Sequence, residues 1–253
     1  MHNPFAAADV GVVYDRGRPY HHPRSLARIA ALVGDDRVRD ALDVACGTGM
    51  STVALGARAD RVIGIDVSTA MLRAARTASN VSYAFASAEC MPFPDASFDA
   101  VTCCSGVHWF DQVRFYAEMH RVLRPNGWVG LYDHYYVGEM VDVPEFKAWT
   151  GEALQRYPLP PRNPQVGDPR SQNPDGFVAL GDEFFADDIA MTPEALADYQ
   201  LTISNFVAAA EGGTPPAELR AWIIESTAPF YAGERERIVR FLGSISCWRR
   251  DSS

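Results

Sequence analysis

The sequence contains no apolar run long enough to cross a bilayer, and its first residues lack the cationic start and apolar stretch of a secretory signal. We therefore expect a soluble, cytoplasmic protein that does not act at a membrane. Basic side chains are outnumbered, since 23 Lys and Arg face 32 Asp and Glu and give a formal net charge of −9. Because a negative field repels polyanions, nucleic acid is not expected as a partner.

Cysteine is scarce and unpatterned: the chain has five cysteines, and none of them forms a C-x-x-C pair. Such a set is typical of reduced thiols in a reducing compartment. The composition excludes a mainly disordered chain, because 47% hydrophobic and 22% charged residues are ordinary proportions for a globular protein. At 253 residues, we expect one elaborated domain or a core with an attached lid.

From about residue 38 to about residue 135, short apolar runs rich in β-branched residues alternate with stretches of helical spacing. This rhythm is typical of βαβ units. Several of the runs are apolar on both faces, as are strands that helices cover on each side. The expected strands are residues 41–45, 61–66, 81–85, 99–104 and 128–132.

Local signals mark where helices begin. Ser68, Asp111 and Thr192 each precede a helical pattern and are expected to be N-cap residues. The helix after Asp111 should run from residue 112 to 123, with residues 124–127 ending it. We expect its inward face to hold Val113, Tyr116, Ala117, His120 and Leu123, with His120 at least half-buried.

The most informative segment is a strand that runs directly into a turn with two glycines, Gly47 and Gly49, and then into a helix. Glycines let backbone approach a ligand closely, and a helix N-terminus offers unpaired N–H groups. Asp66 ends the next expected strand, where a carboxylate can accept both hydroxyls of a ribose. Together these features predict a nucleoside site.

Two details favour a cationic nucleoside over a dinucleotide. A pyrophosphate cradle usually has the pattern G-x-G-x-x-G, but Thr52 occupies the position of the third glycine. Asp43 lies just before the turn, and its negative charge would repel a pyrophosphate but attract an ammonium or sulfonium group.

At this point the chain resembles the class I S-adenosylmethionine-dependent methyltransferases, over about residues 40 to 135. Asp43-Val-Ala-Cys-Gly-Thr-Gly49 is similar to the family's first motif, and Val62-Ile-Gly-Ile-Asp66-Val-Ser to its second. Residues 87–99 resemble the adenine-side segment, with Ser87 where many members have aspartate. Leu123-Arg-Pro-Asn-Gly127 resembles the L-[KR]-P-G-G turn before the fifth strand.

The resemblance implies S-adenosyl-L-methionine as cofactor. It puts Asp43 near the ammonium end, Asp66 on the ribose hydroxyls and Ser87 near the adenine amine. The implied cofactor contacts are Asp43, Ala45, Gly47, Thr48, Gly49, Asp66, Val67, Met71, Ser87, Ala88, Glu89, Ser105 and Tyr20.

Within the family, the chain looks most like the type 11, trans-aconitate-methyltransferase-like small-molecule branch. The cues are residues 14–20 and His108-Trp109-Phe110 after the fourth strand. This resemblance implies an α/β fold: a Rossmann-like seven-stranded mixed sheet, the last strand antiparallel, with helices on both faces and a helical cap. Four regions are expected. Residues 1–37 form an N-terminal helical segment over the cofactor site, and residues 38–136 form the cofactor-binding core. Residues 137–230 form lid insertions, which include a proline-rich loop at 157–176, and residues 231–253 form a closing strand.

Methyl transfer from a sulfonium is an in-line displacement, so alignment in a dry site supplies most of the acceleration. A neutral acceptor must also lose a proton. His108 and His134 follow the fourth and fifth strands and are candidate proton acceptors, with loop-bound histidines as the alternative. Tyr14 and Tyr20 could cover the cofactor, and Trp109 and Tyr135 could contact the substrate, although these rings could equally pack the core.

Several functions are disfavoured. No Asn/Asp-Pro-Pro-aromatic segment of a base-flipping amino methylase follows the fourth strand. Residues 105–108 supply no cluster of oxygen ligands for magnesium, so no metal is expected. We therefore expect a metal-independent methyltransferase acting on a small molecule at oxygen, nitrogen or carbon, as a monomer or homodimer. A nicotinamide-dependent oxidoreductase and a non-catalytic cofactor-binding module remain the alternatives.

Overall fold

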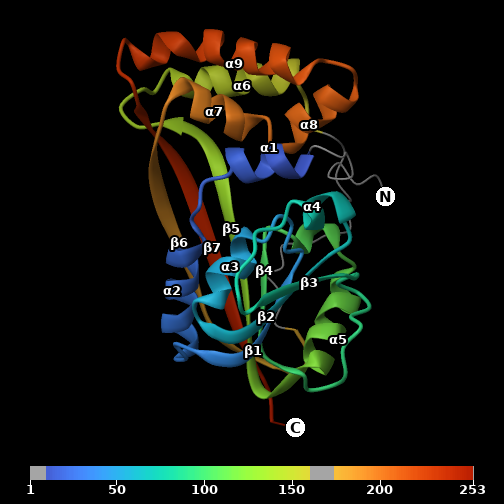
Figure 1. Ribbon diagram of the computed structural model, residues 1–253. Coiled ribbons are helices and arrows are strands. Elements are labelled where there is room, and N and C mark those ends of the chain that lie inside the picture. Colours follow the sequence, from blue (N-terminus) through green and yellow to red (C-terminus); the bar gives the residue numbers. More distant parts are fainter. Residues whose placement is uncertain (1–9, 160–173, 253) are drawn as a thin grey trace. The chain divides into compact units, whose positions relative to one another are not determined.

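A computed structural model of the protein describes residues 10–159 and 174–252 (Figure 1). The chain divides into two compact units. The sheet unit comprises Tyr20–His134, Asn163–Phe184 and Gly243–Ser253, and the helical unit comprises Met1–Pro19, Tyr135–Arg162 and Phe185–Leu242. The expected strand, turn and helix of the cofactor loop all belong to the sheet unit.

The strands form one seven-stranded mixed sheet of order β3-β2-β1-β4-β5-β7-β6, with the last strand of the chain antiparallel, which confirms the expected fold class. The strands are β1 (Val38–Val44), β2 (Ala59–Asp66), β3 (Val81–Phe85), β4 (Phe98–Cys104), β5 (Leu123–Met140), β6 (Phe177–Met191) and β7 (Arg237–Arg250).

The order of the first strands determines where a ligand can bind. β1 pairs in parallel with β2 on one side and with β4 on the other, and Asp43 lies opposite Gly64 and Thr102. Because these strands are parallel, their carboxyl ends meet at one edge of the sheet. The turn after β1, the end of β2 and the loop after β4 therefore converge there.

Helices cover both faces of this part of the sheet, with α2 and α3 on one face and α5 on the other (Figure 1). The helices of the sheet unit are α2 (His22–Val33), α3 (Met50–Gly56), α4 (Thr69–Arg73), the 3₁₀ turn η1 (Val107–Trp109) and α5 (Gln112–Val122). Those of the helical unit are α1 (Val10–Gly17), α6 (Phe146–Arg156), α7 (Pro193–Gln200), α8 (Ser204–Glu211) and α9 (Pro216–Tyr231).

The three expected N-caps are confirmed. Ser68 accepts from the amide of Met71, Asp111 from that of Arg114, and Thr192 from that of Ala195. Each bond satisfies one of the otherwise unpaired amides in the first turn of a helix.

The expected inward face of α5 is wrong at Val113 and Ala117, whereas Tyr116 and Leu123 are buried as expected. Val113 is 80% exposed and Ala117 is also exposed, whereas the buried residues are Gln112, Phe115, Tyr116, Met119 and Val122. The buried face of α5 is rotated from the expected one because Phe115 and Met119 pack into the core of the sheet unit. His120 is half-buried, as expected.

The bounds of β5 and the end of α7 also differ from expectation, since β5 runs to Met140 rather than residue 132, and one strand, β6, is absent from the expected elements. β5 begins at Leu123 because Leu123 pairs with Phe98, and a register shift before the Ala100–Trp128 pair absorbs the turn residues. α7 ends at Gln200 rather than near Asn205, and α8 follows it. β6 is a long edge strand within the region expected to be lid, and its many exposed side chains conceal it. Most of the predicted proline-rich loop, 160–173, lies outside the described residues.

Each unit has a core of its own. In the sheet unit the cluster includes Leu42, Ile65, Val101, Phe115 and Leu131. In the helical unit it includes Phe146, Tyr199, Phe206, Ile223 and Phe241. None of the helices in the described ranges has the length and apolar character needed to cross a bilayer.

Candidate cofactor site and neighbouring strand ends

The turn after β1 is built on three residues with left-handed backbone: Ala45 (φ 54°), Gly47 (φ 53°) and Gly49 (φ 74°). The amide of Gly49 donates to the carbonyl of Cys46 at 2.9 Å and closes the turn. A Cβ on Gly49 would lie 2.1 Å from the hydroxyl of Tyr83, so any other residue there would require Tyr83 to shift. Beside Gly47, by contrast, a Cβ would meet only Met71 Cε, at 3.6 Å, which leaves open space on the turn's surface.

Asp43 is fully buried below this turn. Its carboxylate accepts from the hydroxyls of Ser51 at 2.6 Å, Thr52 at 2.7 Å and Thr102 at 3.0 Å. Burial raises the pKa of Asp43 to about 6, although the three hydrogen bonds oppose the shift. The residue thus ties α3 and β4 to the end of β1, while its expected role at the ammonium end of the cofactor stays a prediction.

Thr52 explains the missing third glycine. Its side chain is buried and bonded to Asp43, so a hydroxyl donor fills the place that glycine would leave vacant. The turn is therefore supported from within by a carboxylate, and not by close packing of helix on strand.

Asp66 stands at the carboxyl end of β2 and is half-buried. One carboxylate oxygen accepts from the amide of Gly47 at 2.9 Å, and the other accepts from the amide of Ser68 at 2.7 Å. Burial raises its pKa, and these amides act in the opposite direction. The amide of Val67 also donates to this carboxylate, and because a carboxylate has about four acceptor sites, Asp66 can still receive a hydroxyl donor.

Three more of the expected contacts adjoin this edge. Val67 is 52% exposed directly after Asp66, and Met71 is buried in the first turn of α4 with its methyl group nearest Gly47. Tyr20 is exposed, and the guanidinium of Arg76 lies 5.3 Å from its ring centre. The amide of Arg76 in turn donates to the carbonyl of Thr48 at 2.9 Å, so Tyr20 is connected to the turn through one residue.

Thr48 gives a direct test of whether this edge fits a polar ligand. Its hydroxyl is buried and has no hydrogen-bond partner among the described residues. A buried hydroxyl without a partner costs roughly 1–3 kcal/mol, so such groups usually signal a ligand or water. With the open space at Gly47 and the acceptors of Asp66, the donor set fits a nucleoside.

The expected adenine-side segment is held by its own hydrogen bonds. The Ser87 hydroxyl donates to the Glu89 carboxylate and accepts from the Glu89 amide, and Ala88 is buried between them. The second oxygen of Glu89 accepts from the amide of Asp111 at 3.1 Å. Ser87 and Glu89 therefore join the segment after β3 to the beginning of α5.

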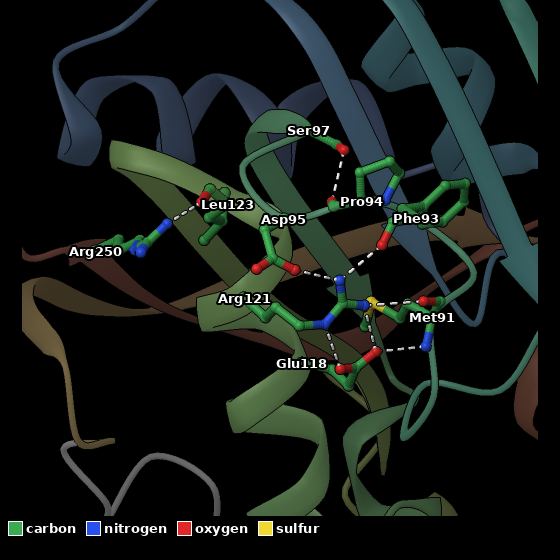
Figure 2. A network of polar contacts seen from close by, with 9 residues as sticks. All are labelled: Met91, Phe93, Pro94, Asp95, Ser97, Glu118, Arg121, Leu123 and Arg250. Atoms are coloured by element: carbon green, nitrogen blue, oxygen red, sulfur yellow. Dashed lines mark hydrogen bonds and ion pairs between the residues drawn. The ribbon is translucent and has the colours of Figure 1, made fainter.

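Arg121 of α5, which is not among the expected site residues, holds residues 91–95, which follow the adenine-side residues Ser87 to Glu89. Figure 2 shows its guanidinium donating to the carbonyls of Met91 and Phe93 and to the carboxylates of Asp95 and Glu118. The hydrogen bond from Arg121 holds the pKa of Glu118 below its usual range. The spacing of Glu118 and Arg121, three residues apart on one helix, is the sequence signal that indicates the pair.

The loop after β4 lies against the β1 turn. Ser105 has left-handed backbone (φ 54°), and its amide donates to the carbonyl of Tyr132 at 2.9 Å. A Cβ on Gly106 would lie 2.7 Å from the Cβ of Ala45, so the two loops are in close contact. His108 and Trp109 follow in η1, both half-buried, with ring centres 5.0 Å apart.

The expectation that His134 follows the fifth strand is wrong, because β5 continues through it to Met140. His134 is buried within β5 and stacks face to face on His21, with ring centres 4.0 Å apart and planes 9° apart. His21 Nδ1 lies 3.1 Å from the hydroxyl of Ser25, and His22 Nδ1 lies 3.0 Å from that of Tyr132. His21 and His22 are absent from the expected site. Their position directly after Tyr20 is the signal that could have indicated them.

The remaining two expected residues belong to the helical unit. Tyr14 lies on α1, where the guanidinium of Arg18 is 4.8 Å from its ring centre and 5.2 Å from that of Tyr199. Tyr135 is 39% exposed. The expected roles of Tyr14 as a catalytic residue and Tyr135 as a substrate contact stay predictions.

Comparison with known proteins agrees with this geometry. Residues 42–131 match the family model described as a methyltransferase domain. The chain is 38% identical over 93 residues to a "Putative methyltransferase" of Dictyostelium discoideum, across 36% of this chain and 35% of that protein. It is 35% identical over 155 residues to the demethylmenaquinone methyltransferase of Mycobacterium sp. (strain KMS), across 60% of each chain.

The chain thus spans less than two thirds of these curated relatives. A solved structure described as a "Putative Type II Methyltransferase" from Anaeromyxobacter dehalogenans is similar over 91% of this chain and 97% of that one, with a TM-score of 0.66 and 28% identity. These matches identify residues 42–131 as the domain of a class I S-adenosylmethionine-dependent methyltransferase.

Proposed function

We propose that the protein transfers a methyl group from S-adenosylmethionine to oxygen, nitrogen or carbon of a small organic acceptor, and that no metal takes part in the transfer step. The single observation that carries the proposal is the Asp66 carboxylate, bonded to the Gly47 amide at the edge where β1 and β2 end. A carboxylate there supplies acceptors for a ribose beside a turn that leaves room for a ligand.

The residues of the sheet unit divide the work of holding the cofactor. Asp66 would accept the ribose hydroxyls, the Thr48 hydroxyl would find its missing partner, and Ser87 with the Ala88 backbone would face the adenine. Bound S-adenosylmethionine supplies an electrophilic methyl group on a sulfonium. The chain's own contribution is to align that group with the acceptor and to keep water away from it.

His108 and His134 are the proposed proton acceptors for a neutral nucleophile. His108 follows β4, whose carboxyl end lies at the ligand-binding edge of the sheet, and His134 lies within the neighbouring strand β5 two residues after Tyr132, which pairs with the last residue of β4. A histidine with an ordinary pKa can accept a proton near neutral pH and release it again to solvent. Trp109, in ring contact with His108, would form a wall of the acceptor site.

A small-molecule acceptor is supported by charge and by similarity. The net charge of −9 disfavours nucleic acid as a substrate. One relative is named for methylation of demethylmenaquinone, a small molecule. The type 11, trans-aconitate-methyltransferase-like branch is our proposal for the subfamily, and a cytoplasmic monomer or homodimer is our proposal for the assembly.

Two measurements test the proposed function. Calorimetry should detect micromolar or tighter binding of S-adenosylhomocysteine, and no heat up to millimolar ligand would contradict it. Incubation with metabolite extracts and an isotopically labelled methyl donor should then yield a labelled product by mass spectrometry. Binding without any product would indicate a non-catalytic module, and enhanced fluorescence of added NADH or NADPH would indicate an oxidoreductase.

A further inference from the structure

Two adjacent histidines and one distant cysteine meet in the sheet unit. His21 precedes α2, His22 is its first residue, and Cys104 is the last residue of β4. Each offers one ligand atom, and these three atoms lie within 4.8 Å of one another. Both histidines are buried and Cys104 is half-buried, so this is an interior cluster and not a chance group on the surface.

We infer that His21, His22 and Cys104 bind one zinc ion. Thiolate and imidazole are ligands that suit zinc, whereas magnesium and calcium prefer oxygen. Zn–S bonds of about 2.3 Å and Zn–N bonds of about 2.0–2.1 Å put tetrahedral ligand atoms roughly 3.3–3.7 Å apart. The observed separations therefore need to close by only about 1 Å, which side-chain rotation can supply.

The surroundings hold both imidazoles in place. His21 Nδ1 is paired with the hydroxyl of Ser25, and His22 Nδ1 with that of Tyr132. Zinc-bound histidines ordinarily use their second ring nitrogen in such a hydrogen bond, which fixes the ring's orientation. One ring nitrogen of each histidine is the proposed ligand atom. The His134 ring stacked on His21 limits the rotation of that ligand to the small adjustment that zinc binding needs.

Three protein ligands leave the fourth tetrahedral position to water or to an anionic group of a ligand, as in catalytic zinc sites. When zinc binds, the Cys104 thiol loses its proton to solvent and its sulfur forms the metal bond. The sequence predicts no metal because residues 105–108 supply no cluster of oxygen ligands for magnesium, and histidines far along the chain from Cys104 give no spacing signal for zinc. The inference does not depend on the methyl transfer step, for which we propose no metal.

Metal analysis of the tag-free full-length protein tests the site. Protein loaded with zinc chloride and then desalted should retain about one zinc per chain. His22→Ala and Cys104→Ser should each weaken zinc binding at least about a hundredfold, and Ser25→Ala about tenfold, because the last removes only the partner of His21. Cys90→Ser and His120→Ala are matched controls outside the cluster and should retain wild-type zinc.

Cobalt binding to the wild-type protein, followed by absorption spectroscopy, tests the site even if one of the variants does not fold. Cobalt chloride added to the metal-free protein should produce a sulfur-to-cobalt charge-transfer band, and zinc chloride should abolish it. Absence of the band, or equal zinc in Cys104→Ser and wild type, would overturn the inference. Loss of zinc in the Cys90→Ser control would also overturn it. If protein loaded with equal zinc and copper retained copper alone, the choice of zinc would be refuted. Cofactor binding, measured separately with S-adenosylhomocysteine, distinguishes this failure from failure of the proposed function.

Discussion

The carboxylate of Asp66 accepts a hydrogen bond from the amide of Gly47 at 2.9 Å, which joins the end of β2 to the turn after β1. The same side chain accepts from the amide of Ser68, which caps α4. One carboxylate therefore organises two loops at the edge where we propose that the cofactor binds. Its removal should affect the ligand and the loops together.

Asp66→Ala is expected to weaken S-adenosylhomocysteine binding at least about tenfold, since each charge-assisted hydrogen bond to a ribose hydroxyl contributes roughly 1.5–3 kcal/mol. Calorimetry measures the change. Asp60→Ala is the matched control, because Asp60 lies on the same strand with an exposed side chain paired to Arg37. Unchanged affinity in Asp66→Ala would show that the ribose is held elsewhere.

Gly49→Ala should be far more destabilising than Gly34→Ala, although the two glycines have nearly the same φ, 74° and 75°. Left-handed backbone costs a non-glycine residue about 1–2 kcal/mol at both positions. At Gly49 the new methyl group also meets the Tyr83 hydroxyl, while at Gly34 it meets nothing within 4 Å. The additional overpacking cost is about 1–3 kcal/mol.

Urea denaturation of the two glycine variants measures the difference in unfolding free energy. Equal losses would mean that Tyr83 moves aside freely. That outcome would conflict with the Tyr83 hydroxyl's hydrogen bond to the carbonyl of Arg76, at 2.6 Å.

Local sequence rules predicted the parts of this fold that are determined locally. Ser68, Asp111 and Thr192 cap helices because the bond is made within three residues, and the pattern shows it directly. Asp66 could be placed beside the glycine turn because parallel strands bring their carboxyl ends to one edge. The spacing along the chain contains enough information for both conclusions.

The wrong or missing predictions depend on contacts that sequence spacing does not encode. Val113 and Phe115 are both apolar, and only packing against the sheet decides which of them is buried. β6 is an edge strand with many exposed side chains, so its apolar and polar residues do not alternate in the way that indicates a strand. The hydroxyl partners of Asp43 lie on two other elements, so spacing along the chain did not indicate them, and its expected role toward the cofactor stays a prediction.

The buried Asp43 carboxyl should make stability depend on pH. Its folded pKa is raised from 3.8 to about 6, so the native state binds more protons than the unfolded state between these values. Unfolding free energy therefore falls as pH rises from about 4 to about 6, by about 3 kcal/mol in total. Below about pH 4 the Asp43 carboxyl is protonated in both the native and the unfolded state, so it no longer makes the unfolding free energy depend on pH.

Denaturation of wild type and Asp43→Asn at pH 4, 5, 6 and 7 isolates this contribution. The wild type should lose stability relative to the variant as pH rises, and Asp60→Asn supplies the baseline for an exposed carboxyl on a neighbouring strand. A difference that is flat, or that grows in favour of the wild type, would mean that Asp43 is ionised without cost.

Arg121→Met should loosen the adenine-side segment, because the guanidinium holds the carbonyls of Met91 and Phe93 (Figure 2). Its ion pairs are partly exposed and screened, so we expect a loss of only about 2 kcal/mol in unfolding free energy. Affinity for S-adenosylhomocysteine should fall by about threefold to tenfold. Arg114→Met, on an exposed position of the same helix, should change neither quantity.

Once an acceptor has been identified, His108→Ala should separate proton transfer from cofactor binding. A positioned general base contributes about a hundredfold to ten-thousandfold to rate, so turnover should fall in that range while affinity for S-adenosylhomocysteine stays unchanged. His134→Ala is the competing variant, and the one with the larger loss of turnover identifies the base. His120→Ala is the control, since His120 lies in the last turn of α5 with its Nε2 3.7 Å from the Asp251 carboxylate and takes no part in the proposed chemistry. Full turnover in both His108→Ala and His134→Ala would show that the acceptor arrives already deprotonated, or that another group accepts its proton.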